Sequence, residues 1–191
     1  MHVVNGLPAH VLLVHFVVVF VPLTGLLLCA CAIWPKVARR VGIVLPLLAL
    51  ATVTSVPLTT QAGEWLEARV GSDPLVRRHA ELGDGLLPWA TALFVMAVAI
   101  WWVARRSAAA GASGGTSEGA ASEDAEGGTS GGTSGSTLWA ATPVRIAAAV
   151  LSVAVATGAV VDVVRIGDSG AKAAWHDSFS KTPQGGQGDG D

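Results

Sequence analysis

The chain has 191 residues, of which 51% are hydrophobic and 14% are charged, and its formal net charge at pH 7 is −2. Ordinary soluble domains carry about 25% charged residues, so the composition argues against a soluble fold. The near-neutral charge and the lack of a basic patch interleaved with aromatic residues exclude nucleic acid as a predicted partner.

Four apolar stretches approach or exceed the length needed to cross a bilayer, which is about 20 helical residues. Backbone groups in the hydrocarbon core have no water to bond with, so these stretches must be helical. We therefore predict an all-α fold, a four-helix transmembrane bundle with up-down topology, with the lipid bilayer as its partner. The predicted spans are residues 11–33, 41–58, 86–104 and 146–164.

The first span follows Pro8, and proline suits the start of a helix because its missing N–H has no partner there. No Lys or Arg precedes this stretch, and it is longer than the apolar core of a secretion signal, so we expect it to be retained. The connection at 36–40 is short, which predicts an antiparallel hairpin of spans one and two. Cys29 and Cys31 form no disulfide framework or haem-attachment motif and are interpreted as packing residues.

Residues 61–84 form the longest loop that is expected to be structured, and residues 64–67 are predicted to continue the second helix beyond the bilayer. Ser72 or Asp73 is predicted to cap a new helix, with Pro74 at its first position. This third helix is then expected to begin outside the bilayer, to run into it, and to bend near Pro88.

The rest of the chain divides by composition. Residues 1–106 contain the first three transmembrane helices and the outer loop 61–84, and residues 138–180 contain the fourth helix and an outer extension. Residues 107–137 are rich in Gly, Ser, Thr and Ala, and such a segment buries too little apolar surface to fold. We predict a disordered linker there and a disordered tail at 181–191.

All five histidines lie at one membrane face if the chain crosses four times: His2, His10, His15, His79 and His176. Histidine titrates near neutrality and is the commonest metal ligand, so a one-sided set is a candidate site. His10 and His15 are five residues apart and point about 140° away from each other on a helix. His15 lies inside the apolar run, where an ionisable group is costly, and His79 is its expected partner.

Carboxylates on the same face supply further candidate ligands. Glu64 and Glu81 lie close to His79 in sequence, and mixed imidazole and carboxylate ligands suit zinc or copper(II). Asp162 is the only acid within a predicted span, and Arg165 follows three residues later. That spacing predicts a structural ion pair along one helix face.

Residues 7–16 carry the pattern H-x-x-x-V-H-F, formed by His10, His15 and Phe16. Together with residues 63–66, 79–83 and 165–171, they resemble the bacterial membrane family called domain of unknown function 2231. The resemblance implies a four-helix integral membrane protein and brings no established activity. Relatives often carry histidine where Asp168 stands, so the resemblance does not imply a fixed metal stoichiometry for this chain.

Three functional hypotheses remain open. The first is a redox protein that holds haem b between His15 and His79, because helical bundles bind cofactors in this way. The second is an outward-facing metal or proton site formed by His10, His15 and His79 with Glu64 or Glu81. The third is a non-catalytic membrane subunit or scaffold whose histidines hydrogen-bond across the outer ends of the bundle, and which associates with a membrane protein partner or a second copy. Motifs for hydrolytic or phosphate chemistry are lacking, so an enzyme is not expected.

Positive charges predict the orientation of the chain. They divide evenly between the two faces, but those at 36–40 and at Arg105 and Arg106 lie in short segments next to spans, where they influence orientation most. These segments and the linker 107–137 are therefore assigned to the cytoplasm. A multi-pass protein of the plasma membrane is predicted, with both termini and the histidine face outside.

Overall fold

The computed structural model describes residues 3–4, 7–70, 73–113 and 142–175. Two strands of two residues each, β1 (Val3–Val4) and β2 (Leu7–Pro8), pair antiparallel ahead of the first helix. The remaining elements are helical, which confirms the predicted all-α bundle. They are α1 (Ala9–Ile33), α2 (Pro35–Val41), α3 (Val44–Val70), α4 (Pro74–Asp84), α5 (Leu86–Ser113) and α7 (Thr142–Trp175).

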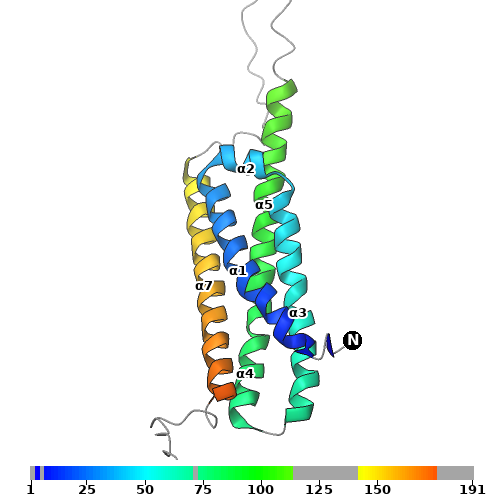
Figure 1. The fold of residues 1–191 in the computed structure, drawn as a ribbon. Coiled ribbons are helices and arrows are strands. Elements are labelled where there is room, and N and C mark those ends of the chain that lie inside the picture. The colour runs from blue at the N-terminus through cyan, green and yellow to red at the C-terminus, as the bar shows by residue number, and fades with distance from the viewer. Residues whose placement is uncertain (1–2, 5–6, 71–72, 114–141, 176–191) are drawn as a thin grey trace, which may run out of the picture.

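The four long helices α1, α3, α5 and α7 run side by side and alternate in direction (Figure 1). α1 packs against α3 and α7, and α5 completes the bundle by packing against the same two helices. The short helix α2 lies across one end, whereas α4 lies at the other end beside the last turns of α7 (Figure 1). This arrangement is the predicted up-down topology.

Four helices are long and apolar enough to cross a membrane. Large apolar side chains also cover the outside of the bundle, among them Leu26, Val150 and Val164, which are 72%, 64% and 63% exposed. So much exposed apolar surface is unfavourable in water and matches contact with lipid. These features indicate a multi-pass membrane protein whose spans lie within Ala9–Ile33, Val44–Arg69, Pro74–Ala109 and Pro143–Trp175.

Small residues and one polar contact bring the helices together in the core. A methyl group built on Gly25 would lie 3.0 Å from the side chain of Ala156, so α1 and α7 nearly touch at this level. The hydroxyl oxygens of Thr24 and Thr52 lie 2.7 Å apart and join α1 to α3, and both residues are fully buried. Close approach of backbones and hydrogen bonds between helices are how helices associate inside lipid.

The boundaries of the elements differ from the sequence predictions in three places, at residues 36–40, at Gly85 and at residues 107–113. The connection predicted at 36–40 is the helix α2, which begins at Pro35. The third span is interrupted at Gly85 and not near Pro88. Pro88 is the third residue of α5, and a proline in the first turn removes no intrahelical hydrogen bond.

Other local predictions agree with the structure. The second helix continues through residues 64–67 to Val70. Asp73 caps α4, because its carboxylate accepts a hydrogen bond of 2.7 Å from the backbone N–H of Leu75, and Pro74 takes the first helical position. α5 includes residues 107–113, which were assigned to the linker. The rest of that linker and the predicted tail at 181–191 lie outside the described residues.

Candidate functional site

Four helices contribute to one end of the bundle, where α1 begins, α3 and α7 end and α4 lies between the ends of α3 and α7 (Figure 1). Residues that are far apart in sequence meet there. The start of α1 contributes His10, the last part of α3 contributes the backbone around Thr59, and α4 contributes His79. The last part of α7 contributes Ile166 and Ser169.

His10 joins the start of α1 to α3. Its Nδ1 atom lies 3.0 Å from the carbonyl oxygen of Thr59, and a carbonyl oxygen only accepts, so Nδ1 carries the hydrogen. The ring also packs against Gly63, where a built Cβ would lie 3.1 Å from its Cε1 atom. Nε2 of the neutral ring is then left with a free lone pair.

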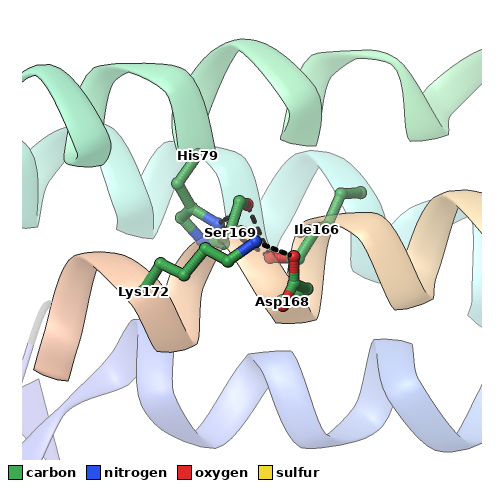
Figure 2. A network of polar contacts seen from close by, with 5 residues as sticks. All are labelled: His79, Ile166, Asp168, Ser169 and Lys172. Atoms are coloured by element: carbon green, nitrogen blue, oxygen red, sulfur yellow. Dashed lines mark hydrogen bonds and ion pairs between the residues drawn. The ribbon is translucent and has the colours of Figure 1, made fainter. Parts of the chain in front are cut away.

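His79 joins α4 to α7 through a three-membered polar network (Figure 2). Its Nδ1 atom lies 3.1 Å from the carbonyl oxygen of Ile166 and 3.0 Å from the hydroxyl of Ser169. That hydroxyl donates to the same carbonyl at 2.8 Å, so its lone pair accepts from His79. His79 therefore has the same tautomer as His10, with hydrogen on Nδ1 and a lone pair on Nε2.

His10 and His79, which we call the histidine pair, are neighbours. Their ring centroids lie 6.3 Å apart and the ring planes are nearly perpendicular, at 86°. Each ring is held by a carbonyl of a different helix, and each keeps the lone pair of Nε2. In this tautomer the Nε2 atom of each ring is the nitrogen that can accept a proton or bind a metal ion.

His15 does not pair with His79 as the sequence predicted. It is exposed on the outer surface of α1, and its Nδ1 atom bonds to the carbonyl oxygen of Val11 at 2.6 Å, one turn back in its own helix. His10, five residues earlier, is the histidine of α1 that faces into the bundle. The prediction that His10 and His15 point different ways agrees with this arrangement.

The carboxylates predicted as ligands do not gather around the histidines. Glu81 is exposed and forms an ion pair with Arg77 at 3.3 Å, and Glu64 is also exposed. Within the described part of the chain, no three or more side chains of His, Cys, Asp or Glu are arranged to hold a metal ion. His10 and His79 are therefore neighbours without a third candidate ligand, and the predicted set of His10, His15, His79, Glu64 and Glu81 is not assembled among the described residues.

The predicted ion pair between Asp162 and Arg165 is not formed either. The ion pairs among the described residues are Arg77 with Glu81 and Asp168 with Lys172. Asp162 instead directs Oδ2 to the junction of α4 and α5, where that atom is buried and has no hydrogen-bond partner in the part of the chain that the structure describes. Arg165 is exposed and lies beside the pair of Asp168 and Lys172, away from the bundle interior.

The groups that hold the two rings were not predicted from the sequence. The partner of His10 is the backbone carbonyl of Thr59, which the residue type at that position does not indicate. Gly63 and Gly170 were available as signals, because each leaves room for an imidazole that a side chain would fill; a Cβ on Gly170 would lie 2.9 Å from Cε1 of His79. Ser169, next to Gly170, also holds the ring of His79 and was not predicted to do so.

Fold and site together define a four-helix integral membrane protein with two imidazoles fixed at one end of the bundle. Comparison with models of protein families, with curated proteins and with solved structures gives no match for this chain.

Proposed function

We propose that this protein binds one divalent transition-metal ion between the Nε2 atoms of His10 and His79, at one face of the membrane. The observation that carries the proposal is the pair itself, two rings whose centroids lie 6.3 Å apart on different helices. Zn–N bonds of about 2.0–2.1 Å place the centroids of two imidazoles on one ion roughly 5 to 6 Å apart. The separation of the two rings is therefore close to that of two imidazoles on one ion, and the proposal requires that both rings turn Nε2 toward it.

The hydrogen bonds of the two rings also support the proposal. Metal-binding histidines almost always donate their other N–H to a carbonyl or carboxylate, which fixes the tautomer and the ring orientation. His10 donates to Thr59 and His79 to Ile166 in this way. Imidazole nitrogen suits zinc, copper and nickel, so these ions are the proposed ligands.

Two protein ligands leave coordination positions open, which is unlike the closed four-ligand sites that stabilise folds. We therefore propose reversible metal binding and no catalysis by this chain alone. The open positions are available to water, or to a ligand from a partner membrane protein or a second copy. In this proposal the protein is a metal-binding membrane subunit.

Membership of the domain of unknown function 2231 family is part of the proposal. The four segments that carry the resemblance include His10, Gly63, His79, Ser169 and Gly170, and these residues meet around the pair. Shared residues that converge in space are expected if the family preserves one site. We further propose the plasma membrane as the location, with the histidine pair on the outer face, because the short basic segments lie at the opposite end.

The test replaces each histidine of the pair with asparagine. The asparagine amide sits where Nδ1 was and can still donate to the carbonyl, but it removes Nε2, so the variants separate a ligand role from a structural one. Wild type, His10→Asn and His79→Asn are purified without a histidine tag, stripped with a chelator, and titrated with zinc and copper(II). We expect about one ion per chain in wild type and at least a 100-fold loss of affinity in either variant. Loss of a residue that only hydrogen-bonds to a metal ligand typically lowers metal affinity about 10–100-fold, and loss of the ligand itself should cost more.

His15→Asn is the matched control, because His15 bonds only within its own helix, and it should bind metal as wild type does. Thermal unfolding of all variants shows whether each one folds. Equally weak metal binding in wild type and both variants, all folded, would overturn the proposal. If wild type shows a Soret band after haem supplementation and both variants lose it, the bound group is haem b and not a metal ion.

A further inference from the structure

A pocket of about 380 Å³ lies between α4 and α7, at the same end of the bundle as the histidine pair. Each lining residue has another lining residue three or four positions away on its own helix, so the set on each helix shares one face. Ser169 lines the pocket as well as bonding to His79, which places the two sites next to each other. The other lining residues are Leu75, Arg78 and Leu82 on α4 and Arg165, Asp168 and Lys172 on α7.

The pocket is positively charged. The carboxylate of Asp168 accepts from the ammonium group of Lys172 at 2.6 Å (Figure 2), which leaves the guanidinium groups of Arg78 and Arg165. Neither arginine forms an ion pair with another described residue. Since one arginine comes from each helix, an anion held between α4 and α7 can contact both side chains, and arginine binds phosphate through two parallel hydrogen bonds.

The remaining wall is apolar and lies at the edge of the membrane. Leu75 and Leu82 line the pocket on α4. On α7, Arg165 directly follows Val164, whose apolar side chain is exposed on the outside of the bundle, and the helix ends at the exposed Trp175. Tryptophan marks the boundary between acyl chains and water, so the pocket lies at the level of lipid headgroups.

We propose that this pocket binds the phosphate headgroup of an anionic phospholipid. The two guanidinium groups contact the phosphate, and the leucines contact the glycerol and the first part of an acyl chain. A free phosphate ion uses the same arginines but gains nothing from Leu75 and Leu82, which is why we assign the site to a lipid. The inference does not depend on metal binding by the histidine pair.

The experiment titrates the full chain in a neutral detergent with short-chain phosphatidylglycerol, short-chain phosphatidylcholine and inorganic phosphate, and follows binding by calorimetry. Wild type should bind phosphatidylglycerol more tightly than the other two. Arg78→Gln and Arg165→Gln should each weaken that binding by about tenfold, because each removes a charge-assisted hydrogen bond. Arg77→Gln is the matched control, since Arg77 is next to Arg78 but faces Glu81 outside the pocket, and it should bind within twofold of wild type.

Three results would overturn the inference: equal binding of the two phospholipids, an equal loss in the Arg77 control, or phosphate binding as tight as that of phosphatidylglycerol. The last result would assign the site to a free anion. Arg165→Lys keeps the charge and loses the paired hydrogen bonds, so it should fall between wild type and Arg165→Gln. This variant provides the test if removal of the charge prevents folding.

Discussion

Gly158 on α7 lies against the indole ring of Trp89 on α5. A Cβ built at Gly158 meets three carbon atoms of that ring, among them Cε3 at 2.8 Å. We predict that Gly158→Ala lowers the free energy of unfolding by about 1–3 kcal/mol, because overpacking forces the ring and the helices apart. Thermal or detergent-induced unfolding of the purified protein measures the change.

Gly167→Ala is the matched control for this prediction. It lies on the same helix, and a Cβ built there has no atom within 4 Å. The same substitution should therefore leave stability unchanged or raise it by up to about 1 kcal/mol, since alanine favours helix more than glycine. Equal losses in the two variants would show that α7 needs both glycines for a reason other than contact with Trp89.

The surroundings of Asp162, Arg165 and His15 differ from those predicted from the sequence. The spacing of Asp162 and Arg165 permits an ion pair, yet the two side chains face different surroundings, the α4–α5 junction and the α4–α7 pocket. His15 was expected to be buried because it lies in an apolar run. In a membrane bundle the lipid-facing side of a helix is as apolar as the buried side, so the run alone cannot distinguish the two.

At the scale of elements, the contact between α1 and α3 depends in part on the hydroxyls of Thr24 and Thr52. We predict that Thr24→Val lowers the free energy of unfolding by about 0.6 kcal/mol and by no more than about 1.7, the range measured for such bonds in membranes. The cost is modest because the hydroxyl of Thr52 keeps its bond of 2.9 Å to the carbonyl of Leu48. Unfolding in denaturing detergent provides the measurement.

Thr54→Val, on α3, is the control for Thr24→Val. The hydroxyl of Thr54 is exposed and bonds only to carbonyls of its own helix, at Leu50 and Ala51. Its removal should therefore leave the contact between helices intact. If Thr54→Val costs as much as Thr24→Val, the hydroxyl bridge does not hold α1 and α3 together.

Elements were predictable where the chain carries a local signal. Length and apolarity identified the four spans, and the cap and proline at Asp73 and Pro74 identified the start of α4. α2 begins with Pro35 at its first position, a helix-start signal directly before the segment 36–40 that was predicted as a short connection. A bend was predicted near Pro88, but the helix is interrupted at Gly85. Pro88 lies in the first turn of α5, where a proline does not disturb the helix.

For the whole molecule, the sequence predicts the number of spans, their alternation and the shared end of His10, His15 and His79, whereas His2 and His176 lie outside the described residues. It does not predict which histidines meet, because that depends on the rotation of each helix about its own axis. The rotation of α1 that places His10 opposite His79 also turns His15 outward. Rotation is determined by small residues and polar contacts such as Gly25 and Thr24, which become informative only once their neighbours are known.

The up-down topology places α2 and α4 at opposite ends of the bundle (Figure 1), and this arrangement leads to a prediction about the intact membrane. Single cysteines replace Arg40 on α2 or Arg77 on α4, both exposed, in a chain whose native cysteines are changed to alanine. A maleimide that cannot cross membranes should label the Arg77→Cys variant on intact cells and the Arg40→Cys variant only after permeabilisation, because the short basic segments favour the cytoplasm.

Lys172→Cys, at the α4 end, should behave as Arg77→Cys does. Labelling of the Arg40 and Arg77 variants from the same side would contradict the four-span topology, whereas the reverse pattern would contradict only the proposed orientation and place the histidine pair in the cytoplasm.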